Sequence, residues 1–301
     1  MDRPLLMTHQ VMLSDGPRLR AYDRAIERAV GPGDIVVDIG AGTLVLSMLA
    51  LRHGAGHVYA VEGDPRMADV AARITADNDL KDRLTLIVAD ARTAQLPAGV
   101  RADVLVSEMM GNLGPEEQMA EVLAAVARRL LRPGGRVVPR RLVTRLAPIQ
   151  FDGEGWGVWD DDRLGYRLDA VVDAVPPAAQ LHFFQRAPRL LGPPVTVVDS
   201  ELGRDGDARP RGGRRLSIDE PGRLHALVGY FEADLADGVA LSNFPSYAGC
   251  NWATWIWPLR PTSVAAGDEL RVEIHRPRRP DGVRVATDWR LECGVIRQRS
   301  A

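Results

Sequence analysis

The chain has 301 residues, of which 46% are hydrophobic and 26% are charged, and its formal net charge is −2 at pH 7. This length and composition are those of a globular protein with room for two domains and a large core. The small net charge excludes a basic surface field of the kind that holds nucleic acid or an anionic membrane without specificity.

The cysteines and the N-terminal segment limit the class of protein further. Cys250 and Cys293 are the only two cysteines and have no CxxC spacing, so the sequence indicates neither a disulfide framework nor a zinc site. The N-terminus lacks a secretory signal pattern, and no stretch reaches the ~20 apolar residues of a membrane span. We therefore expect a cytoplasmic protein with no bound metal and no membrane or nucleic-acid partner.

The first part of the chain predicts a polar segment, a turn and a helix. Residues 1–18 form the polar segment, within which Asp15-Gly16-Pro17 is a turn signal. Apolar residues at helical spacing then predict a helix from Leu19 to Val30.

The residues from Ile35 to Pro65 predict a βαβ unit. An apolar run carries Asp38 to the tight turn Gly40-Ala41-Gly42, a helix follows, and a second apolar run ends at Glu62. Such glycines let backbone amides approach a ligand at a helix N-terminus, and an acidic residue roughly 20 positions on can accept hydrogen bonds from a ribose diol.

This unit occurs in dinucleotide dehydrogenases and in S-adenosylmethionine (SAM) methyltransferases. Asp38 directly precedes the turn, and Leu44 stands where a dehydrogenase pattern has a third small residue. Both features favour the first motif of class I SAM methyltransferases. The alternative interpretation is that Gly40 and Gly42 only permit a tight turn.

The alternation of helices and strands continues to Pro139. We expect helices at Pro65–Asn78 and Pro115–Leu131, and strands at 84–88, 104–106 and 136–138. This order predicts a parallel sheet covered by helices, whose ligands bind outside the carboxyl ends of the strands. The acidic residues Asp38, Glu62, Asp90 and Glu108 all fall at those ends.

Beyond Pro139 the pattern changes to strands separated by turn clusters. The strand-like pieces are 142–149, 195–198, 224–232, 252–259, 269–275 and 287–292. They predict an antiparallel barrel or sandwich. Within it, residues 156–191 are richer in helix-compatible and aromatic residues and have the look of an insertion, and 204–215 is expected to be a mobile loop.

The second informative stretch runs from Ser107 to Glu117, SEMMGNLGPEE. On one continuous helix, residues nine positions apart point about 180° from each other, so Glu108 and Glu117 would not converge. The glycines and Pro115 break such a helix into a strand end, a loop and a new helix start. The two carboxylates can therefore face each other across the turn.

Two carboxylates in one cleft repel each other unless a cation lies between them, and a planar guanidinium suits that position through bidentate hydrogen bonds. Beside a cationic sulfonium donor, the pair also offsets the repulsion between two positive groups and leaves one guanidinium nitrogen free to attack the methyl carbon. The alternative is that Glu116 and Glu117 only satisfy a helix N-terminus and Glu108 is a loop residue.

These residues resemble those of the protein arginine methyltransferase family. The segment SEMMGNLGPEEQM is similar, without a gap, to the family's double-glutamate loop, which places the two substrate glutamates at Glu108 and Glu117. HQVMLSDGPRLRAY resembles the stretch before the first motif, RLHALVGYFEADL resembles the family's barrel, and NWATWIWPLRPTSVAAGDEL resembles the segment that begins with its Thr-His-Trp loop.

The resemblance implies a fold and an assembly. It implies an α/β protein with a Rossmann-like SAM-binding domain over residues 1–139 and an antiparallel β-barrel substrate domain over residues 140–301. A helical arm at about 156–191 would be inserted in the barrel and dock on a second subunit, giving a homodimer. Pro139 matches a proline that joins the two domains and is often cis.

The resemblance also implies roles for individual residues. Arg18 would bind the carboxylate of SAM, and Glu62 would bind its ribose hydroxyls. The remaining cofactor residues would be Asp38, Gly40 and Gly42 around the first motif, with Asp90, Ala91 and Arg92 beside the adenine. Glu108 and Glu117 would be catalytic, and the acceptor would contact Met12, Met109, Asn251 and Trp252.

Some positions depart from the family pattern. The family's Tyr-Phe-x-x-Tyr lid starts further upstream of His9 than the eight residues printed before it, so we expect that lid to be missing or replaced. Asn251 replaces the histidine of the Thr-His-Trp loop; it can still hydrogen-bond Asp15 but cannot relay a proton. Met109 and Asn112 replace aromatic residues at the substrate entrance.

The sequence therefore predicts a SAM-dependent N-methyltransferase acting on a guanidino nitrogen of free arginine, an arginine-derived metabolite or a peptidyl arginine. One alternative is an O- or N-methyltransferase for a small metabolite without a guanidine. Another is a SAM-binding protein without catalytic activity that regulates or scaffolds a partner.

Overall fold

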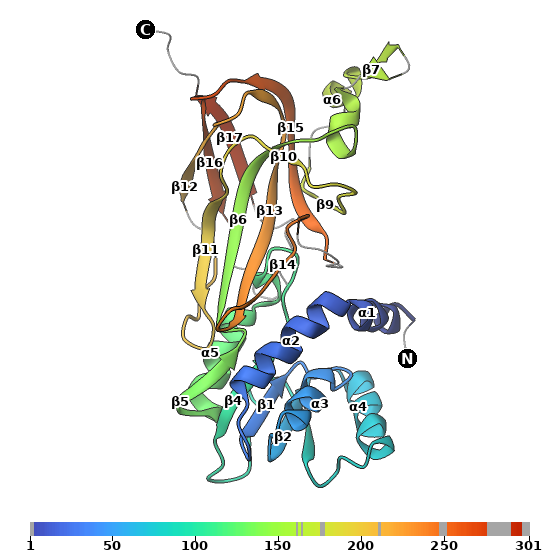
Figure 1. Ribbon diagram of the computed structural model, residues 1–301, viewed down its shortest axis with the longest axis vertical. Coiled ribbons are helices and arrows are strands. Elements are labelled where there is room, and N and C mark those ends of the chain that lie inside the picture. The colour runs from blue at the N-terminus through green and yellow to red at the C-terminus, as the bar shows by residue number, and fades with distance from the viewer. Residues whose placement is uncertain are drawn as a thin grey trace.

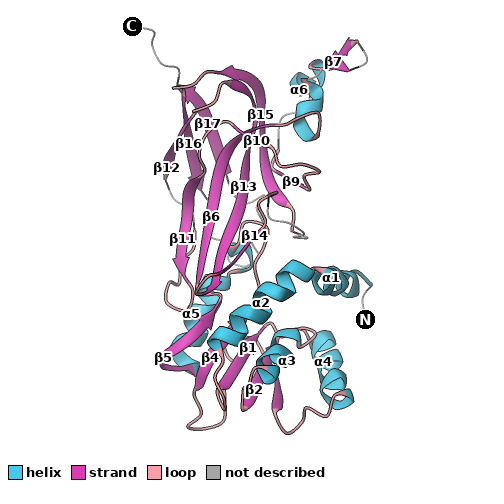
Figure 2. Cartoon of the chain, viewed as in Figure 1, coloured by secondary structure: helices cyan, strands magenta, loops and turns pink. Residues whose placement is uncertain are grey.

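The computed structural model describes residues 3–160, 162–163, 165–174, 178–209, 212–246, 252–275 and 290–296. The molecule is elongated, with a parallel sheet and its helices at one end and antiparallel sheets at the other (Figure 1). Most helices gather around the parallel sheet, and the short helix α6 stands apart at the far end (Figure 2). No helix in the described ranges has the length and apolar character that crossing a membrane requires.

The first domain is built on a five-stranded parallel sheet with the order β3-β2-β1-β4-β5. Its strands are β1 (Ile35–Ile39), β2 (His57–Glu62), β3 (Leu84–Val88), β4 (Ala102–Ser107) and β5 (Leu131–Val138). Its helices are α1 (Arg3–Ser14), α2 (Gly16–Ala29), α3 (Val45–Arg52), α4 (Pro65–Asp77) and α5 (Met119–Leu130), with a 3-10 turn, η1, at Pro115–Glu117. The expected parallel sheet and Rossmann-like arrangement are confirmed.

The N-terminal segment differs from the prediction. Residues 3–14 form helix α1 instead of an irregular polar segment. The turn signal at residues 15–17 is a helix start: the Asp15 carboxylate accepts a hydrogen bond from the Arg18 amide at 3.0 Å, and Pro17 lies in the first turn of α2. Asp, Gly and Pro favour a helix N-terminus as well as a turn, so their order alone did not distinguish the two.

The order of the strands sets the place of the ligand site. β1 lies between β2 and β4, and Asp38 is in register with Ala60 on one side and Val106 on the other. The chain leaves β1 toward β2 and leaves β4 toward β5, in opposite directions along the sheet, so the strand order reverses between β1 and β4 and a crevice forms there at the carboxyl ends of the strands. The buried valines of β1 and β4 hold this part of the sheet in the main core.

The second domain consists of antiparallel sheets, as expected. A seven-stranded sheet has the order β10-β6-β13-β15-β9, with β11 also paired to β6 and β14 to β13, and a three-stranded sheet has the order β12-β16-β17. These strands are β6 (Arg141–Gln150), β9 (Gln180–His182), β10 (Arg189–Leu190), β11 (Val195–Glu201), β12 (Gly213–Ser217), β13 (Gly222–Ala236), β14 (Val239–Ser242), β15 (Thr254–Val264), β16 (Glu269–His275) and β17 (Arg290–Ile296). Among the described strands no hydrogen-bonded ring closes, so the structure shows two sheets where the sequence predicted a barrel.

The segment 156–191 lies mostly outside these sheets. It contains the end of a 3-10 turn, η2 (Gly155–Trp159), the short hairpin β7 (Asp162–Arg163) and β8 (Tyr166–Arg167), and helix α6 (Ala170–Ala174) before β9 and β10. Figure 1 shows the hairpin and α6 projecting from the end of the antiparallel domain. The segment therefore has less helix than expected but does protrude.

The two domains meet along α2 and the loop after β4. Arg28 of α2 donates to the Asp237 carbonyl in the turn between β13 and β14, and Thr144 of β6 donates to the Leu113 carbonyl in the loop after β4 at 2.7 Å. The Val138–Pro139 peptide bond, between β5 and β6, is cis. The seam therefore lies next to the carboxyl end of β4, where Glu108 begins the candidate site.

Candidate functional site

A cavity of about 680 Å³ lies at the carboxyl ends of β1, β2 and β4. Side chains of α1 and α2, the turns after β1 and β2, the loop after β4 and one residue of the antiparallel domain line it. They are Met7, Thr8, His9, Val11, Met12, Asp15, Arg18, Gly40, Gly42, Glu62, Asp64, Met67, Glu108, Met109, Met110, Gly111, Asn112, Glu117 and Trp252. The cavity thus brings together both glutamates, Arg18, the glycine turn and Trp252 from distant parts of the chain.

The glycine turn forms one wall without side chains. Gly40 and Gly42 both have positive φ, and a Cβ on either would press on Met109 or on His9, respectively. The Glu62 carboxylate accepts the Gly42 amide at 2.8 Å and the Asp64 amide at 2.8 Å, one with each oxygen. These bonds fix the carboxylate at the end of β2 and leave lone pairs on both oxygens for a diol.

Asp38 lies beneath this turn and does not line the cavity. Its Oδ2 accepts a hydrogen bond from the Ser47 hydroxyl at 2.6 Å, and its Oδ1 is buried without a hydrogen-bond partner. Burial raises the pKa of Asp38 to about 7, with Glu62 adding to the rise and the Ser47 hydrogen bonds opposing it. Asp38 therefore supports the turn from below, and its predicted contact with the cofactor stays a prediction.

Arg18 and Glu108 form an ion pair on the floor of the cavity. Arg18 reaches Glu108 through its NH2 group, and the two side chains are only 12% and 8% exposed. The second oxygen of Glu108 accepts the Met110 amide at 3.1 Å. The Arg18 guanidinium also lies 5.0 Å from the centre of the Trp252 ring. One guanidinium is thus already held between a carboxylate and an indole.

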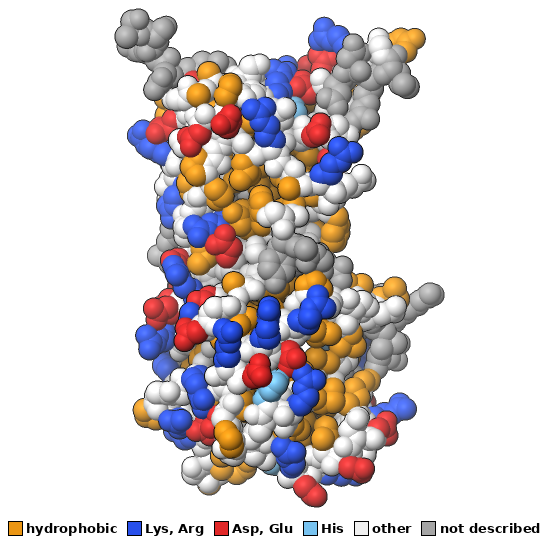
Figure 3. Space-filling view, in the orientation of Figure 1, with side chains coloured by type: hydrophobic (Ala, Val, Ile, Leu, Met, Phe, Trp, Pro, Cys, Tyr) orange, Lys and Arg blue, Asp and Glu red, His pale blue; other side chains and the backbone are white. Residues whose placement is uncertain are grey.

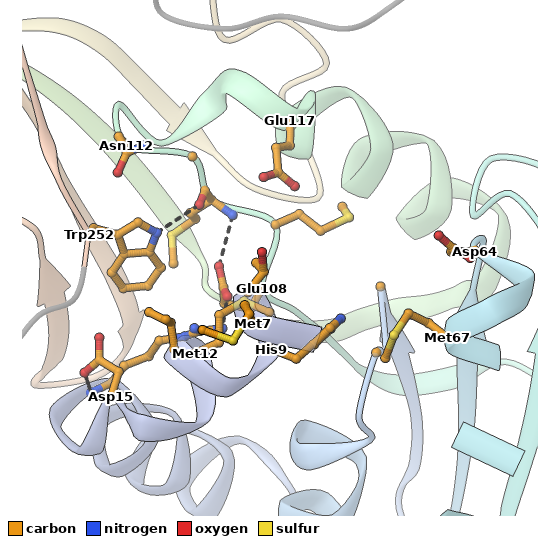
Figure 4. Close-up of a pocket in the computed structure, with 18 of the residues that line it drawn as sticks. Met7, His9, Met12, Asp15, Asp64, Met67, Glu108, Asn112, Glu117 and Trp252 are labelled. Atoms are coloured by element: carbon orange, nitrogen blue, oxygen red, sulfur yellow. Dashed lines mark hydrogen bonds and ion pairs between the residues drawn. The ribbon is translucent and has the colours of Figure 1, made fainter. Parts of the chain in front are cut away.

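Glu117 enters the cavity from the other side (Figure 4). Figure 4 shows its carboxylate pointing into the space above Glu108, with Trp252 at one end and Met67 at the other. Burial raises the pKa of Glu117. A cation bound between the two carboxylates would lower that pKa again.

The loop between the two glutamates is broken more strongly than predicted. Gly111 and Gly114 form an isolated antiparallel β-bridge. The Gly111 nitrogen lies 3.1 Å from the Gly114 carbonyl oxygen, and the Gly114 nitrogen lies 3.0 Å from the Gly111 carbonyl oxygen. The predicted helix from Pro115 to Leu131 was wrong at its start: a 3-10 turn covers Pro115–Glu117, Gln118 has φ 59°, and α5 begins at Met119. Pro115 and the two glutamates fit a first helical turn, but the left-handed Gln118 separates that turn from α5.

The antiparallel domain holds this loop by its carbonyl groups. The buried Thr144 hydroxyl donates to the Leu113 carbonyl at 2.7 Å, and the Asn243 amide donates to the Asn112 carbonyl at 2.7 Å. The Trp252 indole donates to the Met110 carbonyl at 3.2 Å. Three side chains of the second domain thus fix the backbone that carries the glutamates.

Several predicted site residues lie outside the lining of the cavity. Asp90 and Arg92 pair with each other on the surface after β3, at 2.9 Å, and the Ala91 carbonyl accepts a hydrogen bond from Arg129. Their expected place beside an adenine stays a prediction. Asn251, the predicted partner of Asp15, lies outside the described residues.

The sequence did not single out several residues that the structure adds to the site. Met7, Met67 and Met110 join Met12 and Met109, so five methionines line the cavity. Thr144, within β6, and Asn243, directly after β14, had no sequence signal, because a single buried polar residue in or beside a strand forms no recognisable motif. Glu116 was treated as a helix-cap residue, yet it is buried away from the cavity.

The residues present fit SAM better than a metal. No group of three or more His, Cys, Asp and Glu side chains in the described ranges is placed to hold a metal ion. Arg18 suits a carboxylate, Glu62 suits a ribose, and the glycines leave room for the ligand to approach. These are the functional groups that an amino-acid nucleoside carries.

Comparisons with known proteins agree with this chemistry. A family model described as a methyltransferase domain matches residues 36–135. Protein arginine N-methyltransferase 1 of Chlamydomonas reinhardtii is 29% identical over 87% of this chain and 77% of its own length. Arginine N(omega)-methyltransferase of Streptomyces achromogenes subsp. streptozoticus is 31% identical over 88% of this chain and 75% of its own.

Solved structures with the same fold are similarly named. Arabidopsis thaliana protein arginine methyltransferase 10 superposes with a TM-score of 0.76 and 22% identity, covering 96% of this chain and 93% of that one. The Trypanosoma brucei PRMT1 enzyme-prozyme heterotetrameric complex with AdoHcy gives a TM-score of 0.76 and 21% identity, covering 97% and 98%. At these identities the likeness concerns the fold.

Proposed function

Because the chain belongs to the protein arginine methyltransferase family, we propose that it is a SAM-dependent N-methyltransferase acting on a guanidino nitrogen of arginine. The observation that carries the proposal is that Glu108 and Glu117 line one cavity beside the glycine turn and Arg18. A cationic planar group is the ligand that two facing carboxylates favour most.

The donor half of the site comes from the first domain. Arg18 would hold the carboxylate of SAM and Glu62 its ribose hydroxyls, while Asp38 would support the glycine turn that the donor contacts. When bound, SAM supplies an electrophilic methyl group on a sulfonium. In this reaction no covalent bond to the protein forms, so the protein residues orient donor and acceptor and stabilise the charges on them.

The acceptor half lies between the two glutamates. Glu108 and Glu117 would each take hydrogen bonds from the guanidinium and hold its plane, while Trp252 packs beside it. Pairing two of the nitrogens with carboxylates leaves the third free to attack the methyl carbon in line with the sulfur. The proton released from that nitrogen would pass to Glu117 or to water.

Arg18 links the two halves. In the structure it pairs with Glu108, a residue that the acceptor also needs. On donor binding, Arg18 would exchange Glu108 for the SAM carboxylate and thereby free Glu108 for the acceptor guanidinium. Donor and acceptor binding should therefore be coupled, with the donor favouring the acceptor.

The direct test uses labelled SAM with separate acceptor pools. The protein is incubated with methyl-tritiated SAM and, separately, free arginine, guanidino analogues, arginine-containing peptides and metabolites without a guanidine. Label in a guanidino pool, lost in Glu117→Gln, supports the proposal. One named relative acts on protein arginine and another on arginine, so the free-arginine and peptide pools decide which acceptor this chain uses.

The residues at the substrate entrance favour a second candidate function. Met109 and Asn112 give the cavity an apolar and amide lining where the sequence comparison expected aromatic residues. Label only in metabolites without a guanidine would support an O- or N-methyltransferase for such a molecule. S-Adenosylhomocysteine binding with no label in any pool would support the third interpretation, a protein that binds SAM without turnover.

We further propose that the protein forms a homodimer through its 156–191 segment. This segment projects from the antiparallel domain and carries exposed apolar residues, among them Tyr166 at 73% and Leu168 at 37%. Figure 3 shows hydrophobic side chains gathered over the helices of the first domain, where α1 exposes Met7, Val11 and Leu13. Deleting residues 162–174 should convert a dimer to a monomer in sedimentation. The cytoplasmic location stays a prediction.

A further inference from the structure

Glu116, the neighbour of Glu117, points away from the cavity into the seam between the two domains. It lies in the 3-10 turn Pro115–Glu117, where successive side chains project about 120° apart. Glu117 therefore lines the cavity while Glu116 is only 5% exposed and lines no part of it. A carboxylate buried to this degree is costly unless hydrogen-bond donors surround it.

The carboxylate of Glu116 joins the loop to the antiparallel domain. Its Oε2 accepts the Leu113 amide at 2.5 Å, and its Oε1 accepts the indole N–H of Trp255 at 2.9 Å. Leu113 lies midway between the two cavity glutamates, and Trp255 is on β15, paired with Gly229 of β13. One side chain thus connects the turn before Glu117, the middle of the loop and the second domain.

The loop is shaped around this carboxylate. A Cβ on Gly111 would overlap the Glu116 carboxylate, so only glycine leaves room for it there. The Leu113 side chain is fully buried, and a Cβ on Gly229 would meet it at 2.7 Å. The backbone from Gly111 to Glu116 therefore forms a compact loop. Glu108 lies shortly before this loop and Glu117 directly after it.

We infer that Glu116 is a positioning residue that sets the separation and direction of the Glu108 and Glu117 carboxylates by tying their loop to Trp255. The inference rests on the proposed function, because the two carboxylates matter for turnover only if they hold the acceptor. It adds a third glutamate that acts through the other two and does not touch either substrate. SAM binding, which uses Arg18, Asp38 and Glu62, should be independent of it.

The test is a pair of substitutions that each remove one partner of the hydrogen bond between Trp255 and Glu116. In Glu116→Gln one side-chain oxygen remains as an acceptor and the other is replaced by an NH2 group. That NH2 group faces either the Leu113 amide or the Trp255 indole N–H, so one of these two donors loses its acceptor. We expect kcat with the guanidino acceptor to fall by about tenfold to a hundredfold and the acceptor KM to rise, with the dissociation constant for S-adenosylhomocysteine unchanged. Trp255→Phe breaks the same tie from the other domain and should lower kcat as well, and the double variant should fall no more than a few-fold below Trp255→Phe alone, because both substitutions remove one interaction.

Glu117→Gln serves as the contrast, because it removes a cavity carboxylate directly, so its loss of kcat and the loss caused by Trp255→Phe should multiply in the double variant. A readout that needs no acceptor is hydrogen exchange of the peptide containing Leu113, whose amide should exchange faster in Glu116→Gln and normally in Glu117→Gln. If wild-type protein labels no guanidino acceptor but this exchange pattern appears, the proposed function fails while the tie through Glu116 stands.

Two results would overturn the inference itself. One is a Glu116→Gln variant with kcat within twofold of wild type and unchanged exchange at Leu113. The other is equal loss of kcat and of S-adenosylhomocysteine binding, with the losses of Glu116→Gln and Trp255→Phe multiplying in the double variant, which would mean that Glu116 supports the whole fold and does not position the glutamates.

Discussion

Asp38 gives the sharpest prediction, because its carboxylate is fully buried and half paired. Its pKa is raised from 3.8 to about 7, chiefly by burial. The folded protein then holds a proton that the unfolded chain releases between these two values. Stability from this group is therefore complete below pH 3.8 and is lost as the pH rises through 7.

The size of the effect follows from the two pKa values. Three units of difference correspond to about 4 kcal/mol between the low-pH and high-pH limits, because each unit is worth about 1.4 kcal/mol. Roughly 2 to 3 kcal/mol of this falls between pH 5 and pH 8. Asp38→Asn keeps the shape and cannot ionise, so its free energy of unfolding should lack this component.

The assay is urea unfolding of ligand-free wild type and Asp38→Asn at pH 5, 6, 7 and 8. The free energy of unfolding of the variant relative to wild type should rise by roughly 2 to 3 kcal/mol across the series. Ser47→Ala, which removes a hydrogen bond that opposes the pKa shift, should move the change to higher pH. A difference between wild type and Asp38→Asn that stays constant with pH would refute the reasoning.

Three further predictions concern the cavity and its loop. Glu117→Gln should lower kcat by about a hundredfold or more with little change in S-adenosylhomocysteine affinity. Because burial raises the pKa of Glu117 above its usual 4.5, binding of a guanidino acceptor to wild type should weaken on acidification at a pH above 4.5. The variant should not show this weakening. Calorimetry should show that S-adenosylhomocysteine enhances arginine binding to wild type and that Arg18→Met abolishes this enhancement, since Glu108 would no longer change partner; equal enhancement in both would exclude the exchange. Thr144→Val should lower the free energy of unfolding by about 1 to 3 kcal/mol in urea because the Leu113 carbonyl loses its buried donor, whereas an unchanged midpoint would mean that the bond contributes nothing.

The first domain could be predicted from the sequence because its signals are local. The apolar run before Asp38, the glycine turn and Glu62 occur within one βαβ unit, and the pairing of its strands follows from the handedness of that unit. The start of α5 could not be predicted in this way. Pro115 and two acidic residues are what a helix N-terminus prefers, and the sequence gives no local sign that Gln118 adopts a left-handed conformation.

In the antiparallel domain the positions of several strands could be predicted from the sequence, but their order and pairing in the sheets could not. The alternation of residues located β6, β13 and β16, while the partner of each strand depends on contacts between distant segments. Glu116 shows the same limit at the level of one side chain. Its donor is Trp255, 139 positions away, and a buried carboxylate of this kind resembles a surface helix cap until both domains are in place.

The two halves of the candidate site therefore depend on different parts of the fold. The proposed donor residues Arg18, Asp38 and Glu62 all belong to the first domain, where Asp38 and Glu62 lie at the ends of β1 and β2 and Arg18 lies on α2. The acceptor carboxylates belong to the same domain, yet the antiparallel domain supplies the hydrogen bonds that shape their loop. Substitutions in the antiparallel domain should thus change acceptor KM and kcat while leaving donor affinity intact, and a change of acceptor within this fold can proceed without rebuilding the SAM site.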